Sequence, residues 1–409
     1  MKNKKKKKTA KKPWVLPRHK AVTGLIRTLF LPYAKKKYNV KIEKYDAKDT
    51  RPLLILYNHQ TAFDQFFVGG AFKRAIYYVA TEDIFSMGFV SKLIKFLVNP
   101  IPIKKQTTDA RAVINCIRVA KEGGTIAIAP EGNRTYNGKT VYIKPSITAL
   151  ARHLGLPIAF FRIEGGYGVH PRWADDVRKG EMRAGVSRVL EPEEYKDLSD
   201  DELYKLICDE LYCNEAVADK EYHHKNLAQY IERVAYVCPK CGLSTFESHG
   251  DTVHCTKCGI KLRYTPKKQL LGVNCDSPFE FLDDWCNYQN EYVNNLDLSK
   301  MEDAPIYTED VGLWEVILYK EKRLISKSAE ISLYPDKITV KANGELLRFN
   351  FDAVTAISVL GKNKLNVYDG GKVYQIAGSE RFCALKYVNL CFRYKNIAKG
   401  EKNEQFLGL

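Results

Sequence analysis

Short apolar segments alternate with longer amphipathic segments between residues 43 and 215, and this alternation constrains the fold more than any other feature. The apolar segments cover 53–57, 75–80, 125–129 and 157–163. The helical patterns between them cover 64–73, 86–97 and 109–122. Strands that alternate with helices predict an α/β core, in which functional residues gather in the loops at strand ends.

Positive charge is concentrated at the start of the chain. Residues 1–42 contain fifteen Lys and Arg and no acidic residue, so the rest of the chain carries only +2 of the net +17. The apolar residues of this segment recur at helical spacing: Val22, Leu25, Ile26, Leu29 and Phe30. Because a basic amphipathic helix can lie among anionic headgroups, we expect residues 1–42 to form a membrane-facing arm. The alternative is a solvated tail before a helix that packs on the core.

No uninterrupted apolar run reaches the ~18–20 residues that a membrane-spanning helix needs. The best candidate, 24–34, is short and is interrupted by Arg27 and Pro32. We therefore expect a cytoplasmic protein without a transmembrane helix, bound peripherally to the inner face of the membrane.

A histidine and an aspartate follow the apolar segment 53–57 closely. His59 leaves the predicted strand, and Asp64 stands five residues later near the start of the next helix. A carboxylate that reaches one imidazole nitrogen fixes the tautomer and favours the imidazolium formed when histidine takes a proton. The spacing indicates a catalytic pair, although a histidine and an aspartate in one loop are also common without one.

Two further loops carry groups that suit a phosphate. The loop 129–134 reads Ala-Pro-Glu-Gly-Asn-Arg and follows the segment 125–129, where Pro and Gly favour a turn. Its arginine can bind two oxygens of a phosphate at once. Lys104 and Lys105 follow another short apolar stretch, and taken alone they would be a solvated charge pair.

Together these motifs resemble the glycerolipid acyltransferase family, which includes the 1-acyl-sn-glycerol-3-phosphate acyltransferases. That family carries, in order, a His-x4-Asp pair, a strand ending in a basic residue, a Pro-Glu-Gly-x-Arg loop and an apolar segment containing Pro. The matching segments are 59–64, 101–105, 130–134 and 156–163. The resemblance covers about the first 200 residues and implies an α/β acyltransferase core.

The resemblance also implies a reaction and its participants. His59, oriented by Asp64, would be the general base on an acceptor hydroxyl. That hydroxyl would attack an acyl thioester of coenzyme A or acyl carrier protein. The acceptor would be a lysophospholipid, with 1-acyl-sn-glycerol-3-phosphate giving phosphatidate as the leading expectation. The implied substrate-binding residues are Lys105, Glu131, Gly132 and Arg134.

Two positions depart from the family pattern. Lys105 stands where the second block usually ends in Arg, and lysine neutralises a phosphate without the two-pronged geometry of a guanidinium. Asn133 stands where the third block often has Thr or Ser. These differences leave open another lysolipid or a glycolipid as the acceptor.

A glycine-rich stretch follows the fourth block. Residues 165–168 read Gly-Gly-Tyr-Gly and residues 171–173 read Pro-Arg-Trp. They could line an acceptor pocket, or they could form a turn whose aromatic residues pack against the core.

Four cysteines stand in paired Cys-x-x-Cys units. Cys238 and Cys241 form one unit, and Cys255 and Cys258 form the other. Each unit can aim two thiolates at one ion, and four thiolates complete a closed tetrahedral zinc site. The spacing predicts a separate zinc-ribbon module whose zinc is structural, with a redox role as the weaker alternative.

The sequence beyond the cysteines changes from helical to strand-like patterns. Short strand-like segments separated by Asn-Gly and Gly-Gly turns cover 314–375, and a final helix is predicted over 380–394. We expect a β-rich domain that ends in a helix and that resembles a pleckstrin-homology domain in architecture. The predicted division is 1–42 arm, 43–215 acyltransferase, 216–237 helical linker, 238–265 zinc ribbon, 266–312 helical connector, 313–397 β-rich domain and 398–409 tail.

Two other classes of protein must be weighed against the acyltransferase. A nucleic-acid-binding protein would use the lysine-rich start and the zinc ribbon, but it leaves the four ordered blocks unexplained. No nucleic acid is therefore expected as a partner. A lipid-binding adaptor without activity is disfavoured because both His59 and Asp64 are present.

Overall fold

The computed structural model describes residues 12–103, 110–318 and 320–400. The first part of the chain forms a mixed sheet with the strand order β1-β7-β6-β2-β5-β3-β4. Neighbouring strands are parallel except for β6 and β7. The strands are β1 (Val40–Ile42), β2 (Leu54–Tyr57), β3 (Ile76–Thr81), β4 (Ile101–Ile103), β5 (Thr125–Ile128), β6 (Ile158–Glu164) and β7 (Met182–Leu190).

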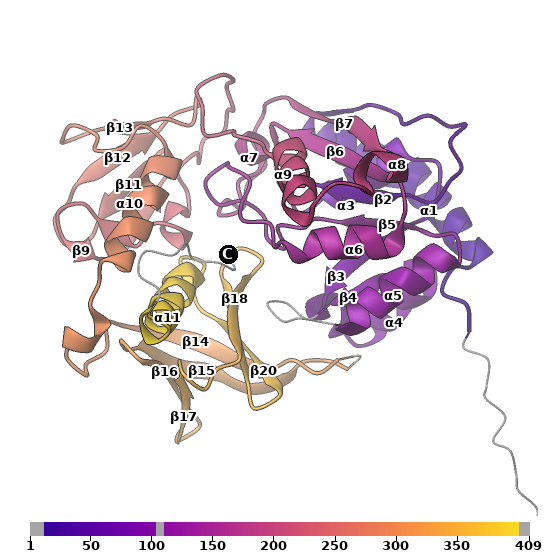
Figure 1. Cartoon of the computed structure of the whole chain (residues 1–409). Helices are drawn as coiled ribbons and strands as arrows, with labels where there is room; N and C mark the ends of the chain where they lie inside the picture. Colours follow the sequence, from indigo (N-terminus) through magenta and orange to yellow (C-terminus); the bar gives the residue numbers. More distant parts are fainter. Residues whose placement is uncertain (1–11, 104–109, 319, 401–409) are drawn as a thin grey trace, which may run out of the picture.

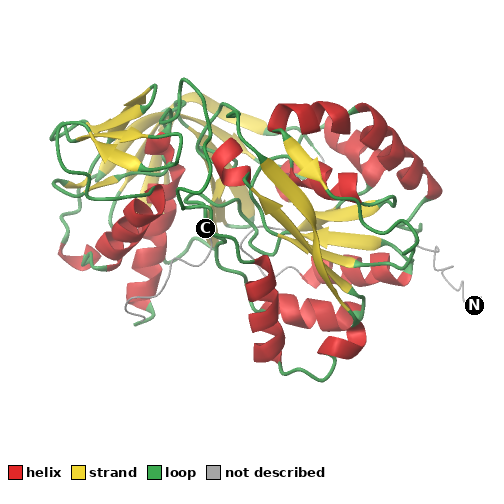
Figure 2. Ribbon diagram, turned by 90° about the horizontal axis from the view of Figure 1, so that it is seen from above, coloured by secondary structure: helices red, strands yellow, loops and turns green. Residues whose placement is uncertain are grey.

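Helices cover both faces of this sheet (Figure 2). Alternate residues of β2 point to opposite faces, so Ile55 and Tyr57 join one apolar cluster while Leu54 and Leu56 join another. The helices are α1 (Pro17–Leu29), α2 (Leu31–Tyr38), α3 (Asp64–Ala71), α4 (Phe89–Val98), α5 (Ala110–Lys121), α6 (Ser146–Leu154), α7 (Gly166–Val169), α8 (Pro192–Tyr195) and α9 (Asp200–Leu211), with a 3-10 turn at Glu82–Phe85. This part confirms the predicted α/β core.

The start of the described chain belongs to this core rather than to a free arm. The predicted helix breaks between α1 and α2, where Pro32 lies in the first turn of α2 and has no N–H for a continuous helix. Ala34 and Tyr38 are buried against the core, and β1 pairs with β7. The boundary predicted at residue 42 therefore lies too late, because α2 and β1 complete the sheet and its cover.

The middle of the chain forms a small antiparallel sheet with the order β10-β11-β12-β13. Its elements are β8 (Val237–Cys238), β9 (Gly242–Leu243), β10 (Phe246–His249), β11 (Thr252–Cys255), β12 (Lys261–Tyr264), β13 (Leu270–Gly272) and α10 (Leu282–Asn294), with 3-10 turns at Ile231–Arg233 and Leu298–Lys300. The sheet continues into the segment predicted as a helical connector, where α10 is the expected helix.

The helical linker predicted over 216–237 is wrong. Apart from the 3-10 turn and Val237 at the start of β8, these residues form no helix or strand, and their backbone groups pair with distant segments. The N–H of Tyr222 donates to the carbonyl of Pro266 at 2.9 Å, and that of Ala228 donates to Gly250 at 2.8 Å. These tertiary hydrogen bonds satisfy the backbone, so the segment needs no helix of its own.

The last part of the chain is an antiparallel sheet with the order β17-β16-β15-β14-β20-β19-β18, followed by one helix. Its elements are β14 (Tyr307–Glu315), β15 (Arg323–Leu333), β16 (Lys337–Ala342), β17 (Glu345–Asn350), β18 (Ala356–Leu360), β19 (Lys364–Asp369), β20 (Lys372–Ala377) and α11 (Ala384–Ala398). This confirms the predicted β-rich domain with a terminal helix. Its β18 and β20 lie on the side toward the α/β core (Figure 1).

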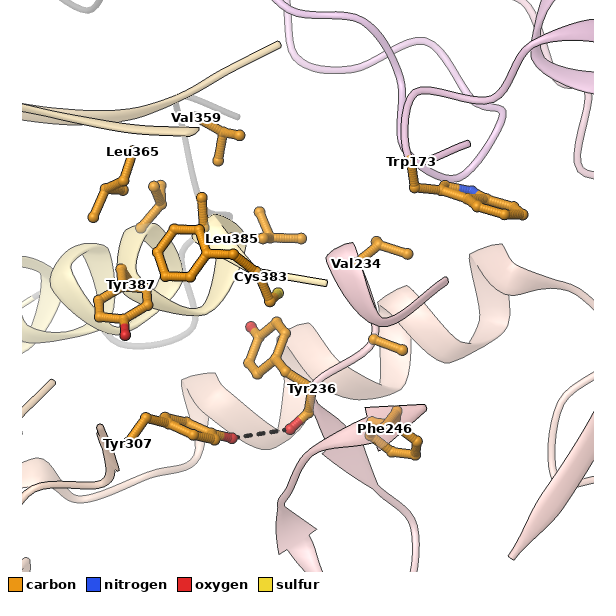
Figure 3. Packing of buried hydrophobic residues seen from close by; sticks show 14 of the residues in the cluster. Trp173, Val234, Tyr236, Phe246, Tyr307, Val359, Leu365, Cys383, Leu385 and Tyr387 are labelled. Carbon is orange, nitrogen blue, oxygen red and sulfur yellow. Dashed lines mark hydrogen bonds between the residues drawn. The ribbon is translucent and has the colours of Figure 1, made fainter. Parts of the chain in front are cut away.

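Buried side chains from all three parts of the chain share one apolar cluster. Figure 3 shows Trp173 of the α/β core, Tyr236 and Phe246 of the middle part, and Leu385 of α11 within it. The hydroxyl of Tyr307 donates to the backbone carbonyl of Tyr236 at 3.2 Å. The cysteine module is therefore packed into the molecule and is not the separate unit that was predicted.

Among the described ranges, no helix is long and apolar enough to cross a membrane.

Candidate active site

The predicted catalytic residues lie at one edge of the core sheet. Strands β2 and β5 are parallel neighbours, so their carboxyl ends reach the same edge. His59 follows β2 by two residues, and Glu131 follows β5 by three. Functional groups of α/β sheets gather at such an edge, and here the strand order brings the first and third sequence blocks together.

His59 and Asp64 form a hydrogen-bonded pair. His59 Nδ1 lies 2.7 Å from Asp64 Oδ2, and the Asp64 side chain is fully buried while that of His59 is 25% exposed. Because a carboxylate accepts, Nδ1 donates and carries the proton in the neutral ring. The opposite nitrogen, Nε2, is then the acceptor, which suits it to take a proton from a hydroxyl group.

Asp64 is held by the loop that it helps to close. As the first residue of α3, it accepts hydrogen bonds from the backbone N–H of Gln60 at 2.8 Å and of Thr61 at 2.9 Å. The Thr61 hydroxyl donates to it at 2.7 Å. These donors hold the carboxylate in one orientation, so it can orient the His59 ring.

The fourth sequence block is tied to the first through Asn58. The Asn58 side chain donates to the carbonyl of Ile163 and accepts from its N–H, both at 2.8 Å. Ile163 lies on β6, next to β2 in the sheet. The paired bonds anchor the strand end from which His59 projects.

Glu131 contacts the backbone of the loop that carries His59. One oxygen accepts from the backbone N–H of His59 at 2.7 Å, and the other accepts from the N–H of Val141 at 2.9 Å. The residue is 6% exposed, and burial raises the pKa of its carboxyl to about 8. Glu131 lines the cavity described below, but its polar atoms hold the backbone of His59, which differs from the substrate-binding role expected of it.

Gly132 permits the turn in the same loop. Its φ of +66° lies in the left-handed region, where a side chain would be strained. Its N–H donates to the carbonyl of Ala129 at 3.0 Å, so this N–H is already used within the turn. Gly132 lines the cavity with its open Cα face.

Arg134 brings a buried positive charge to the site. It is 8% exposed, and its Nη1 has no hydrogen-bond partner among the described residues. Burial and the nearby Arg172 guanidinium lower the pKa of Arg134 to about 10, which still leaves it a cation at neutral pH. A buried cation with an unused donor is costly unless an anion pairs with it, so Arg134 fits the predicted phosphate contact.

Lys105, the remaining predicted substrate-binding residue, lies outside the described residues, as does Lys104.

A cavity of about 920 Å³ opens beside these residues. His59, Glu131, Gly132 and Arg134 line one end, and mostly apolar side chains from α1, α3, β3, α4, α5 and α6 line the rest. A deep apolar cavity with a few polar groups at one end suits an amphipathic ligand.

The described lining includes a thiol, Cys116, on α5. Burial raises its pKa to about 12, so it is not available as a thiolate nucleophile at neutral pH. The chemistry that the described groups support is therefore proton removal from a bound hydroxyl by His59.

Tyr38 and His170 were not predicted to lie near the site. The Tyr38 hydroxyl and His170 Nδ1 are 3.1 Å apart. Burial, followed by the charge of Arg134, lowers the pKa of His170 to about 3, so this ring stays neutral. No motif in the sequence distinguishes either residue, since they come from α2 and from the loop after α7.

The stretch 165–173 combines the two interpretations given for it. Tyr167 and Trp173 are buried in the core, as the packing interpretation predicts. Arg172 is 2% exposed, and its Nη1 donates to the backbone carbonyl of Arg134 at 3.0 Å. Arg172 therefore holds the loop that carries Arg134. In the sequence, only the Pro-Arg-Trp stretch pointed to this arginine.

The four paired cysteines converge at a second site. Cys238 and Cys241 flank the β8–β9 turn, while Cys255 ends β11 and Cys258 follows it. Their sulfur atoms all lie within 4.8 Å of one another. A tetrahedral zinc with Zn–S bonds of about 2.3 Å holds its sulfurs about 3.8 Å apart, so this group of four thiols could hold a metal ion.

Comparison with known proteins finds a family match in the first part of the chain. Residues 39–163 match the family model described as Acyltransferase, so the chain contains an acyltransferase domain over that range. Its bounds enclose His59, Asp64, Glu131, Gly132 and Arg134.

One similar solved structure is the crystal structure of the 1-acyl-sn-glycerophosphate (LPA) acyltransferase, PlsC, from Thermotoga maritima. It is 22% identical with a TM-score of 0.41, and the match covers 47% of this chain and 78% of that one. No curated protein matches the chain.

Proposed function

We propose that this chain, which contains an acyltransferase domain over residues 39–163, transfers an acyl group from a thioester to the free hydroxyl of a lysophospholipid. The leading acceptor is 1-acyl-sn-glycerol-3-phosphate, which would become phosphatidate. One observation carries the proposal: His59, paired with Asp64, lines a mostly apolar cavity together with the buried Arg134, whose Nη1 has no hydrogen-bond partner among the described residues.

His59 begins the reaction as general base. Its Nε2 takes the proton of the acceptor hydroxyl, and the oxygen attacks the thioester carbonyl. The tetrahedral intermediate collapses with loss of the thiolate of coenzyme A or acyl carrier protein. That thiolate receives the proton from His59, which returns to its neutral form while Asp64 keeps the ring oriented.

Arg134 holds the acceptor's phosphate, and Lys105 assists it. The Arg134 guanidinium interacts electrostatically with Asp64 and with His170. A phosphate there would supply the negative charge that its free donor lacks. The apolar remainder of the cavity would then receive acyl chain.

The face that carries α4 binds the membrane in this proposal. Phe89 is 74% exposed and Phe96 is 56% exposed on α4, while Leu29 of α1 is 69% exposed. The same two helices line the cavity with Ile26 and Leu97. Arg18 stacks on Phe96 at 4.2 Å, which places a cation among the apolar groups as a basic interfacial surface requires. A lipid could pass from the bilayer surface into the cavity between these helices.

The cysteine group binds a structural zinc in this proposal. Four sulfur ligands fill a tetrahedral site and leave no position for substrate, so the ion would serve stability. Cys238, Cys255 and their neighbours lie in the shared apolar cluster, which links the ion to the packing of the whole chain.

The decisive experiment is acyl transfer by the purified protein to a panel of phosphate-bearing and neutral acceptors. We expect transfer to lysophosphatidate, and we expect His59→Ala to lower it by about 10³-fold or more with unchanged thermal stability. Near-normal transfer by His59→Ala would contradict the catalytic assignment. Transfer to neutral acceptors alone would contradict the phosphate role of Arg134.

A further inference from the structure

The β18–β19 turn of the β-rich domain reaches the catalytic edge of the core. Arg172 joins the two parts: its Nε donates to the carbonyl of Gly361 at 2.8 Å, and its Nη2 donates to that of Val359 at 3.2 Å. The same guanidinium donates to the carbonyl of Arg134 at 3.0 Å. One buried side chain therefore sets the spacing between this turn and the loop that carries Arg134.

The turn contributes directly to the cavity. Gly361 is the member of the β-rich domain that lines the cavity within the described residues. It has a φ of +61°, and a Cβ there would meet no atom within 4 Å, so this side of the turn faces open space. Lys362 follows Gly361 directly in the turn, so it lies next to the lining of the cavity, although it is not itself one of the lining residues.

Lys362 retains hydrogen-bonding capacity at this position. Its Nζ lies 2.7 Å from Asp175 Oδ1, and its side chain is 28% exposed. Asp175 is shared, because Arg233 Nη1 also binds it at 2.6 Å. An ammonium has three donors, so one bond to Asp175 leaves others for an anion.

Two other cations, Arg233 and Arg134, lie close enough to Lys362 to act on it electrostatically. Burial lowers the pKa of Lys362, and the charges of Arg233 and Arg134 lower it further despite the opposing effect of Asp175. Arg134 Nη1 has no hydrogen-bond partner in the part of the chain that the structure describes. An anion bound between Arg134 and Lys362 would accept a hydrogen bond from the Arg134 donor and would raise the pKa of Lys362.

A second contact keeps the β-rich domain in this position. Lys322, the residue before β15, binds Asp83 in the 3-10 turn before α4 at 2.9 Å. Met87 and Glu321 form an isolated β-bridge beside it. The domain is therefore attached to the α/β core at two places, through Arg172 and through Asp83, and the turn is not free to swing away as a unit.

We infer that the β18–β19 turn completes the acceptor site, with Lys362 as a second cation for the acceptor's phosphomonoester and Arg172 as the residue that positions it against Arg134. This inference rests on the proposed function. It assigns the β-rich domain a part in substrate recognition, and it makes preference for a phosphate-bearing acceptor depend on a residue outside the acyltransferase domain.

The test compares Lys362→Ala and Lys362→Arg with Lys364→Ala in the full chain. Lys364 is an exposed lysine two residues away, so its removal changes the net charge equally. We expect Lys362→Ala to raise the KM for lysophosphatidate about tenfold with little change in kcat, because a charge-assisted bond is lost. The KM for the acyl thioester and for monoacylglycerol should not change. Lys362→Arg should retain the normal KM, and so should Lys364→Ala.

Titration calorimetry with lysophosphatidate gives a readout that does not require acyl transfer. If the wild type binds it and Lys362→Ala weakens binding about tenfold, the inference stands even where no transfer occurs, and only the proposed function fails. If the wild type transfers acyl groups and Lys362→Ala matches Lys364→Ala in KM and in binding, the inference is overturned while the proposed function stands. A change in melting temperature alone would also overturn it, since Lys362 would then be only a partner of Asp175.

Discussion

The Glu131 carboxyl group accepts a hydrogen bond from the backbone N–H of His59 at 2.7 Å. Through its other oxygen it accepts from the N–H of Val141, so one buried side chain fixes both the catalytic loop and the strand-free segment after the Pro-Glu-Gly-Asn-Arg loop. Glu131, from the third sequence block, thus holds the first block in place by binding the backbone of His59. Because its oxygens bind backbone N–H groups, we regard Glu131 as a residue that positions His59.

Replacing Asp64 tests how the His59 ring is oriented. Asp64→Asn keeps the size of the side chain. Its single oxygen replaces the two carboxylate oxygens that accept hydrogen bonds from His59, Gln60 and Thr61. We expect kcat for acyl transfer to fall by about 10²–10⁴-fold, because the amide cannot favour the imidazolium. Steady-state kinetics would show this, and a variant with kcat within about twofold of wild type would contradict the pair.

Replacing Glu131 should alter how stability depends on pH. The folded pKa of about 8 lies above the value of 4.5 for an exposed carboxyl. Between these values the folded state holds a proton that the unfolded state has released, so the stability contribution falls as pH rises from about 4.5 to about 8. Glu131→Gln removes this titration. Urea unfolding at pH 5 and pH 8 should therefore show a larger loss of stability in the wild type than in the variant.

The same variant should also be less active at neutral pH. A glutamine can accept from only one of the two backbone N–H groups, and its NH2 would face the other. We expect a loss of about 1–3 kcal/mol in stability and a fall in kcat. Equal pH dependence in the two proteins would show that Glu131 does not titrate in this range.

Removing a cysteine ligand tests the metal centre. We expect the purified protein to contain one zinc per chain, and Cys258→Ser to lose it with a fall in melting temperature of roughly 10 °C or more. Cys208→Ser is the matched control, because Cys208 is a half-buried thiol on α9 outside the group of four. Mass-spectrometric metal analysis and calorimetry give the two readouts. Zinc-free wild-type protein with freely reactive thiols would rule the site out.

Removing apolar side chains from α4 tests membrane binding. Phe89→Ser with Leu93→Ser deletes two exposed apolar groups, and Leu346→Ser removes a comparably exposed one from β17. We expect the α4 variant to bind anionic vesicles at least about tenfold more weakly, because burial of each side chain contributes roughly 1.5–3 kcal/mol. The control should bind like the wild type. A cosedimentation assay that shows equal binding by all three proteins would exclude this face.

Local patterns in the sequence were sufficient for the fold class and the acyltransferase domain. The apolar pattern of a buried strand or an amphipathic helix can be recognised within a single short segment. The alternation of these patterns in 43–215 therefore predicted the core. Turn residues and ligand spacing are equally local, which is why the cysteine units and the His59–Asp64 spacing could be identified. The same reasoning failed for 216–237, where hydrogen bonds to distant segments replaced the expected helix.

Only the tertiary structure determined which groups surround the His59–Asp64 pair. Glu131 meets His59 because β2 and β5 are neighbours, and Arg172 meets Gly361 although the two lie 189 residues apart in the chain. Such contacts depend on strand order and on the packing of whole domains, which no period or spacing encodes. The amino-acid sequence by itself therefore determined the α/β core and the chemistry of its blocks, whereas long-range packing decided that a turn of the β-rich domain forms part of the cavity.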